Sequence, residues 1–144
     1  MKTKFKLILI LVGLTAMLSS CRTSAPRLDY QALARASILL GVDINMEDNH
    51  KLYLEAANWI GTPYRGGGDS KRGTDCSGMV YQIYRKVYRI QVPRNTEALK
   101  SRSNKIAKRN LKEGDLLFFT SNRSKRKVAH VGIYLKNGKF IHAS

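Results

Sequence analysis

Residues 74–87 read Thr-Asp-Cys-Ser-Gly-Met-Val-Tyr-Gln-Ile-Tyr-Arg-Lys-Val, and this stretch decides how the domain is built. Its apolar side chains recur at helical spacing, at Met79, Val80, Ile83, Tyr84 and Val87. Such spacing predicts a helix with one face buried against a core. Either Thr74 or Asp75 can cap the start of this helix with a side-chain oxygen. We therefore predict that Cys76 lies in the first turn of a buried helix.

The position of Cys76 has a chemical consequence. The helix dipole and the unpaired backbone N–H groups of a first turn favour a thiolate over a thiol. The same N–H groups can stabilise the oxyanion that forms when a thiolate attacks a carbonyl carbon. The alternative is that Cys76 is a small buried hydrophobic residue. Nucleophilic catalysis would also require a base that is held in the right orientation.

Two histidines near the end of the sequence, His130 and His142, are candidates for that base and its orienting partner. They flank Asn137-Gly138, which is a turn signal between two apolar runs. A two-residue turn would pair His142 with Ile133 and place it on the sheet face opposite His130. In that register the imidazoles cannot meet, and the histidines would simply complete an edge hairpin.

We predict instead a three-residue loop over residues 136–138, formed by a type I turn and a left-handed bulge at its glycine. In this register Ile141 lies opposite Ile133 on the apolar face, so the packing pattern supports it independently. His142 becomes the diagonal neighbour of His130, at about 7–8 Å between backbones and within reach of two imidazole rings.

The rest of the sequence places helices before strands. Apolar periodicity and capping residues predict helices over residues 30–40 and from Asp48 or Asn49 to Gly61, and a short helix after Asn95. A turn-rich loop covers residues 62–68. Strands are expected over residues 116–119, 130–135 and 139–143. This order predicts one α+β domain over residues 30–144.

The first 20 residues have the pattern of a signal peptide. Lys2, Lys4 and Lys6 precede an uncharged run that is too short to span a membrane. The run ends in Leu-Ser-Ser-Cys, which is similar to the lipobox of bacterial lipoproteins, so we expect cleavage before Cys21 and lipidation of its sulfur. Residues 21–29 would then form a tether. The alternative is an ordinary signal peptide in which Cys21 is incidental.

Lipidation of Cys21 would determine both location and cysteine chemistry. A diacylglycerol with an added acyl chain anchors a protein stably, so we expect it in the cell envelope, on a membrane and facing the periplasm. The sequence has two cysteines, and a lipidated Cys21 cannot pair with Cys76. A free thiol in an oxidising compartment favours a chemical role for Cys76 over a structural one.

The sequence carries a formal net charge of +16, and it remains strongly basic after the three signal-peptide lysines are removed. An exported protein meets anionic lipid headgroups and acidic peptidoglycan, and the sequence has no nucleic-acid-binding motif, so we expect no nucleic acid partner. We interpret the basic clusters at residues 105–109 and 123–127 as solvated loop charge, with a specific polyanion site as the alternative.

Five ordered blocks of the sequence resemble the NlpC/P60 family of cysteine peptidases. These blocks are Gly61-Thr62-Pro63-Tyr64, Thr74-Asp75-Cys76-Ser77-Gly78, Glu113-Gly114-Asp115-Leu116, His130-Val131-Gly132-Ile133-Tyr134 and His142-Ala143-Ser144. The resemblance extends from about Asn49 to the last residue, and the leading helix resembles single-domain lipoprotein members. It implies a papain-like α+β fold, in which N-terminal helices pack on an antiparallel sheet.

By motif position, the resemblance implies that Cys76 is the nucleophile, His130 the general base and His142 the group that orients His130. Members of the family hydrolyse amide bonds in peptidoglycan stem peptides, at D-glutamyl-diaminopimelate or at D-alanyl-diaminopimelate cross-links. The sequence does not choose between these bonds. We expect a monomer that acts on peptidoglycan stem peptides without a metal or cofactor.

The resemblance also implies three residues near the substrate. Tyr64 would line the oxyanion or substrate side, and Asp75 and Ser77 would lie near polar groups of the peptide. Each has a structural alternative, which is packing for Tyr64, helix capping for Asp75 and a first-turn position for Ser77.

Rival interpretations remain at this stage. A non-catalytic peptidoglycan-binding lipoprotein could keep a degenerate or truncated peptidase fold, and an acyltransferase or amidase could share the triad. Family domains usually continue beyond the His-Ala-Ser block, whereas this sequence stops at Ser144. If it is a fragment, we expect an exposed sheet edge beside His142 and a smaller core.

Overall fold

The computed structural model describes residues 28–121 and 124–144. The predicted signal peptide, the predicted lipidation site Cys21 and the predicted tether as far as residue 27 lie outside these residues. Within the described ranges, no helix is long and apolar enough to cross a membrane.

Four α-helices and one short 3-10 helix occur in the described residues. They are α2 (Tyr30–Leu40), α3 (His50–Trp59), α4 (Cys76–Val87), α5 (Thr96–Ser101) and η1 (Lys108–Asn110). Each α-helix begins after an Asp or Asn whose side chain accepts a backbone N–H of the first turn. Asn49 rather than Asp48 caps α3, and Asp75 rather than Thr74 caps α4. Gly41 ends α2 in the left-handed conformation.

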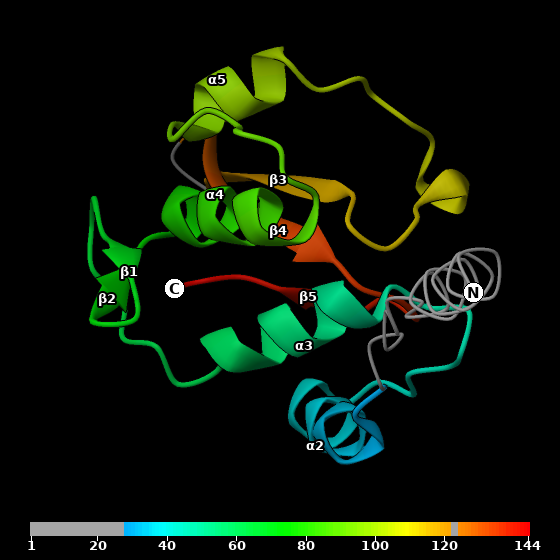
Figure 1. Cartoon of the computed structure of the whole chain (residues 1–144). Helices are drawn as coiled ribbons and strands as arrows, with labels where there is room; N and C mark the ends of the chain where they lie inside the picture. The colour runs from blue at the N-terminus through cyan, green and yellow to red at the C-terminus, as the bar shows by residue number, and fades with distance from the viewer. Residues whose placement is uncertain (1–27, 122–123) are drawn as a thin grey trace, which may run out of the picture.

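The described strands form two antiparallel sheets. A small hairpin joins β1 (Asp69–Ser70) to β2 (Gly73–Thr74), and it was not predicted. The main sheet has the order β3-β4-β5, with bounds Leu116–Ser121, Ser124–Tyr134 and Phe140–Ile141. Helices followed by an antiparallel sheet confirm the predicted α+β class (Figure 1).

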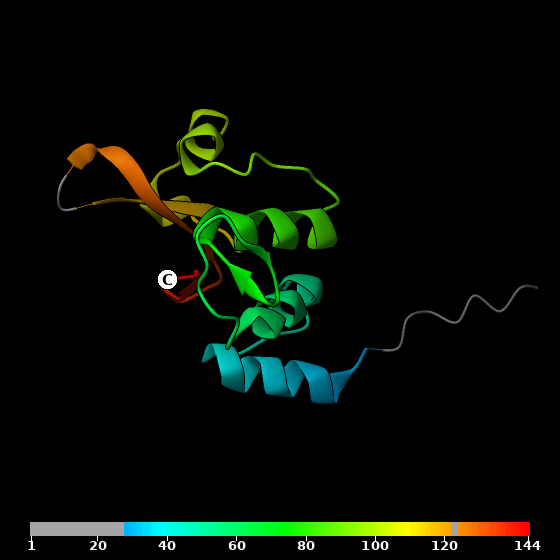
Figure 2. The ribbon, with the colours of Figure 1, turned by 90° about the vertical axis from the view of Figure 1, so that its left-hand side faces the viewer.

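Strand β4 is longer than predicted. The sequence suggested a strand over residues 130–135 and a basic loop over residues 123–127, but residues 124–127 belong to β4. Antiparallel pairing resumes between Ser121 and Ser124 after a register shift, so the segment is part of the strand although its sequence is basic. The outer half of the β3–β4 hairpin projects beyond the helices in Figure 2.

The main core lies between helices α3 and α4 and one face of the main sheet. Leu52, Tyr53 and Ala56 come from α3, Met79, Val80 and Ile83 from α4, Val131 and Ile133 from β4, and Ile141 from β5. In Figure 1, α3 and α4 lie next to each other over the strands, and α2 packs outside α3. The residues of this core, and the partly buried ones around it, all fall between Leu40 and Ala143. A chain that begins at Arg22 therefore keeps the whole core.

Glu55 joins the two central helices through polar contacts. It is only 6% exposed, and it forms an ion pair with Lys86 of α4. The same carboxylate accepts the indole N–H of Trp59 at 3.1 Å. A buried carboxylate is tolerated when it is paired and hydrogen-bonded in this way.

The β4–β5 hairpin has the predicted register but a different turn. Ile133 pairs with Ile141, and the Leu135 N–H donates to the Lys139 carbonyl at 2.9 Å. The predicted type I turn is wrong, because both central residues are left-handed, with φ of 53° at Asn137 and 75° at Gly138. Asn and Gly both tolerate positive φ, and turns of this hand match the twist of the strands.

The core assignment predicts a large difference between two isoleucine substitutions. Ile133 is fully buried, whereas Ile38 of α2 is 81% exposed. We expect Ile133→Ala to lower the free energy of unfolding by about 2–5 kcal/mol, because it leaves a cavity. Ile38→Ala should change it by less than about 0.5 kcal/mol. Urea unfolding followed by circular dichroism measures both values, and equal losses would contradict the core described above.

Candidate active site

Cys76 is the first residue of α4 and opens on a cavity at the start of that helix. Its thiol is free, and the residue is 8% exposed. Sγ lies 3.9 Å from the hydroxyl oxygen of Thr96 in α5. The cavity has a volume of about 330 Å³. Its lining consists of Tyr64, Asp75, Cys76, Ser77, Arg94, Asn95, Thr96, Glu97 and Val128.

Asp75 organises the backbone around the thiol. Its Oδ1 accepts the Gly78 N–H at 2.7 Å and caps α4, while Oδ2 accepts the Gly67 N–H at 2.7 Å. Burial alone would raise the pKa of this carboxyl. The hydrogen bonds from Gly78, Arg94 and Gly67 outweigh burial and hold the pKa below its ordinary value. Asp75 is therefore ionised at neutral pH beside the first turn of α4.

Arg94 clamps three segments together. One guanidinium nitrogen donates to Asp75 Oδ1 and to Ser77 Oγ, each at 3.1 Å. The other donates to the carbonyls of Gly67 and Gly68, each at 3.2 Å. Ser77 Oγ in turn donates to the Arg94 carbonyl at 2.8 Å. The planar guanidinium thus holds the glycine loop and the segment before α5 against the start of α4.

Two glycines make this close packing possible. A Cβ at Gly78 would lie 2.1 Å from the Gly68 carbonyl oxygen and 3.1 Å from Arg94 Nη1. A Cβ at Gly68 would lie 2.4 Å from the Gly73 carbonyl oxygen. Side chains at either position would push the loop away from α4, so the wall of the cavity depends on glycine.

The two C-terminal histidines contact each other on the sheet. His130 Nε2 lies 2.9 Å from His142 Nδ1, and the rings meet edge to face with centroids 5.0 Å apart. Gly132 leaves room for this contact, since a Cβ there would lie 2.9 Å from the Ile141 carbonyl oxygen and 3.4 Å from His142 Cβ. The predicted meeting of the imidazoles is therefore present in the structure.

The strand around His130 is irregular. Phe119 pairs with His130, but Thr120 pairs with Val128, so Ala129 is an extra residue in β4. A bulge of this kind bends a strand and turns its neighbouring side chains. Phe119 and Phe140 flank the imidazole pair, with Phe119 6.1 Å from His130 and Phe140 5.3 Å from His142 between ring centroids.

Burial lowers the pKa of His130, and the neighbouring His142 lowers it further. Both causes favour the neutral imidazole. When Nε2 of neutral His130 carries the proton, it donates to His142 Nδ1. Nδ1 of His130 then has a free lone pair that can accept a proton.

The structure thus gathers the predicted residues into two groups. Tyr64, Asp75 and Ser77 share the cavity of Cys76, and His130 contacts His142. Within residues 28–121 and 124–144, Cys76 and His130 form no hydrogen bond with each other.

Four further residues that line the cavity escaped sequence analysis, namely Arg94, Thr96, Glu97 and Val128. The one sequence feature beside them that indicated structure was Asn95, which was predicted to precede a short helix. Glu97 Oε1 accepts the Val128 N–H at 2.9 Å and so connects α5 to β4 beside the bulge. In the described part of the chain, no group of three His, Cys, Asp or Glu side chains is placed to hold a metal ion.

Comparison with known proteins identifies the family. The model of the NlpC/P60 family matches residues 61–144, which is more than half of the chain. The chain therefore belongs to the NlpC/P60 family, as the five sequence blocks predicted.

Individual relatives agree with this assignment. The "Probable endopeptidase NlpC homolog" of Haemophilus influenzae is 33% identical over 161 residues, which cover 96% of this chain and 85% of that protein. The "Murein DD-endopeptidase MepS/Murein LD-carboxypeptidase" of Escherichia coli is 36% identical over 100 residues, which cover 69% of this chain and 52% of that protein. The crystal structure of the NlpC/p60 domain of the peptidoglycan hydrolase SagA superposes with a TM-score of 0.58 at 36% identity, covering 70% of this chain and 81% of that one.

The environment of His130 predicts a measurable titration. NMR should give a His130 pKa below its ordinary value of 6.5. The unfolded chain then binds more protons than the folded one between the lowered pKa and the ordinary pKa. Folding stability should accordingly fall as the pH drops through this interval.

The variant His142→Gln separates the two causes. Glutamine does not titrate, so the lowering caused by His142 is lost and the pKa of His130 should rise. It should still stay below 6.5, because burial is the larger cause. A His130 pKa above 6.5 in the unmodified chain would contradict the burial described here.

Proposed function

We propose that the protein hydrolyses amide bonds in peptidoglycan stem peptides with Cys76 as the nucleophile. The observation that carries this proposal is a free thiol at the start of a buried helix, opening on a polar cavity in an NlpC/P60 domain. The relatives named NlpC endopeptidase homologue and murein DD-endopeptidase support the same class of cysteine peptidase and the same kind of substrate.

The first turn of α4 supplies the electrostatic part of the mechanism. The N–H groups of Cys76 and Ser77 have no partner within the helix, because first-turn donors precede the repeating hydrogen bonds. These donors and the helix dipole stabilise a thiolate and then the oxyanion of the tetrahedral intermediate. The capping carboxylate of Asp75 accepts the Gly78 N–H and not the N–H groups of Cys76 and Ser77, so these two donors can bind the oxyanion.

The imidazole pair supplies the proton transfers in this proposal. His130 Nδ1 accepts the proton of Cys76 Sγ, and a bond forms between Sγ and the substrate carbonyl carbon. His130 then gives the proton to the leaving amine as the C–N bond breaks, and water hydrolyses the resulting thioester. His142 Nδ1 accepts from His130 Nε2, which holds the ring and stabilises the imidazolium.

Attack requires a local movement of the thiol. Sγ faces Thr96 Oγ1 in the structure, and α4 packs against β4, which carries His130. We propose that substrate in the cavity turns Sγ from Thr96 toward His130. Catalytic hydrogen bonds often tighten only when substrate is bound.

Three residues are proposed to shape substrate binding. Tyr64 is 55% exposed at the cavity, so its ring is available to a peptide. Asp75 and Ser77 line the cavity, but their oxygens already contact Arg94 and backbone groups. We assign Tyr64 to direct contact, and Asp75 and Ser77 to the polar wall near the peptide.

Lipid anchoring completes the proposal. We propose that Cys21 carries lipid, so that the monomeric domain faces the periplasm from a membrane, beside the cell wall. The lipobox-like Leu-Ser-Ser-Cys sequence after an uncharged run supports this location.

Digestion of purified muropeptides tests the catalytic proposal. A form that begins at Arg22 should release products whose masses identify the cleaved bond, at D-glutamyl-diaminopimelate or at D-alanyl-diaminopimelate. Cys76→Ala should lose at least about 10³-fold in kcat, because it removes the nucleophile. Ser101→Ala on α5 is the control, since it deletes a similarly small side chain outside the cavity.

Two outcomes would overturn the catalytic proposal. Full activity of Cys76→Ala would exclude this nucleophile. Absence of cleavage by the unmodified form, with retained binding to sacculi, would favour a non-catalytic peptidoglycan-binding protein.

The anchoring proposal has its own test. Expressed in a bacterium, the full chain should fractionate with membranes and incorporate labelled fatty acid, and Cys21→Ser should abolish the incorporation. Cys76→Ser serves as the control and should leave incorporation unchanged. Label in the Cys21→Ser variant would contradict lipidation at Cys21.

A further inference from the structure

A second and larger cavity lies between β3, the end of α5 and the segment that follows α5. Its volume is about 990 Å³, and it shares no lining residue with the cavity at Cys76. Its apolar lining includes Val92, Leu99, Ile106, Leu111, Leu116 and Phe118. We call this space the β3 groove.

The floor of the β3 groove is continuous with the core. Leu99 is 2% exposed, and Leu116 and Phe118 pack against the core cluster from β3. Ile106 also lines the groove and is 46% exposed. The groove therefore offers an apolar surface that a flexible hydrocarbon chain could cover.

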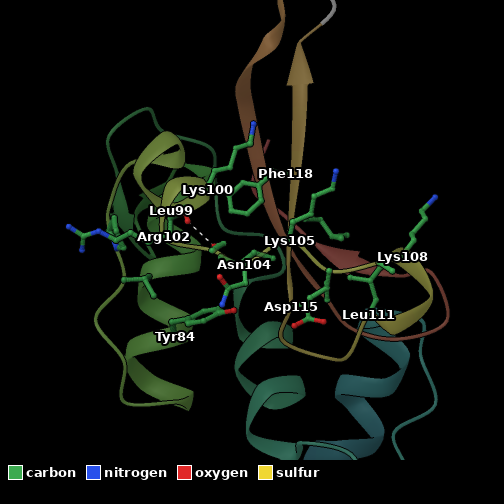
Figure 3. A pocket seen from close by; sticks show the side chains of 17 residues that line it. Tyr84, Leu99, Lys100, Arg102, Asn104, Lys105, Lys108, Leu111, Asp115 and Phe118 are labelled. Atoms are coloured by element: carbon green, nitrogen blue, oxygen red, sulfur yellow. Dashed lines mark hydrogen bonds between the residues drawn. The ribbon is translucent and has the colours of Figure 1, made fainter.

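Four basic side chains form the rim of the β3 groove. Lys100, Arg102, Lys105 and Lys108 line it and are exposed. In Figure 3 the side chain of Arg102 extends to the left of the groove and that of Lys108 to the right, each with its nitrogen atoms at the outer end. Within the described residues, none of the four forms an ion pair.

The lining contains one carboxylate that could oppose these cations. Asp115 belongs to it, and its Oδ2 accepts the Lys112 N–H at 2.7 Å. The lining of the groove therefore holds four basic groups and one acidic group.

We propose that the β3 groove binds an anionic phospholipid, with an acyl chain on the apolar floor and the phosphate on the basic rim. Charge complementarity supports an anionic headgroup, and the apolar floor favours an amphiphile over a purely polar polyanion. The choice of a membrane lipid as the source rests on the proposed anchoring, which brings the domain to a leaflet.

In this proposal, Lys105 and Lys108 of the basic cluster at residues 105–109 bind the lipid phosphate, whereas from the sequence alone we interpreted the cluster as solvated loop charge. A glycan or teichoic polyanion would use the rim but not the floor. A neutral lipid would use the floor but not the rim. Only an anionic amphiphile uses both surfaces together, and this distinction defines the test.

Vesicle flotation measures the interaction with the form that begins at Arg22, which has no Cys21 and keeps the whole core. It should bind vesicles of equal parts phosphatidylglycerol and phosphatidylcholine, and should bind pure phosphatidylcholine vesicles far more weakly. The double variant Lys105→Ala/Lys108→Ala should reduce the affinity about thirtyfold, because each cation near an anionic surface contributes about 1 kcal/mol. Muropeptide hydrolysis in solution should be unchanged.

Matched controls separate the groove from net charge. Arg35→Ala/Lys51→Ala removes two exposed cations from α2 and α3 and should cost no more than about threefold. Ile106→Ser should reduce the affinity about tenfold by removing apolar contact, whereas Ile38→Ser on α2 should not.

Three results would overturn the proposal. One is an equal loss from both double variants, which would indicate net charge only. Another is unchanged binding by Ile106→Ser, which would indicate a polyanion site. The third is binding to sacculi but not to vesicles. A failure of Cys21 lipidation would leave the vesicle result standing, so the two proposals fail separately.

Discussion

The ion pair between Asp75 and Arg94 is the constraint on which the surroundings of the thiol depend. One carboxylate caps α4, accepts the Gly67 N–H and binds the guanidinium. The guanidinium reaches across to the carbonyls of the glycine loop. Because these groups are partly buried and mutually hydrogen-bonded, removing either charge would leave the other without compensation. The start of α4, the loop at residues 66–68 and the segment before α5 are therefore held together as one unit around Cys76.

A second constraint, the β4–β5 hairpin, positions the imidazoles independently of that unit. Its register places Ile133 against Ile141 on the core face and brings His130 to His142 on the other. The two constraints meet where α4 packs against β4 and where Glu97 accepts the Val128 N–H. The position of the Cys76 thiol relative to His130 thus depends on the packing of α4 against the sheet.

Charge is distributed unevenly between the two cavities of this basic protein. The cavity at Cys76 contains Asp75, Arg94 and Glu97, so its positive charge is compensated. The β3 groove has four rim cations against Asp115 alone. An anionic surface would therefore be attracted to the groove rather than to the cavity, so the proposed lipid contact and the proposed peptide binding would use separate residues.

Local signals in the sequence determined the α+β class, the family, the hairpin register and the short helix after Asn95, because capping and strand alternation act over a few residues. For α3 and α4 they narrowed the cap to two adjacent residues each, and the structure chose Asn49 and Asp75. The predicted type I turn at Asn137 was wrong, because a type I turn and the observed turn with positive φ are both compatible with the pairing of Ile133 with Ile141. Only the tertiary structure decided that Arg94 clamps the glycine loop, that Thr96 faces the thiol and that residues 124–127 extend β4. These contacts join segments that are distant in sequence, and Arg94 has no periodicity or spacing that ties it to Asp75. Their geometry comes from close packing around glycine and from strand pairing, which a one-dimensional pattern does not encode.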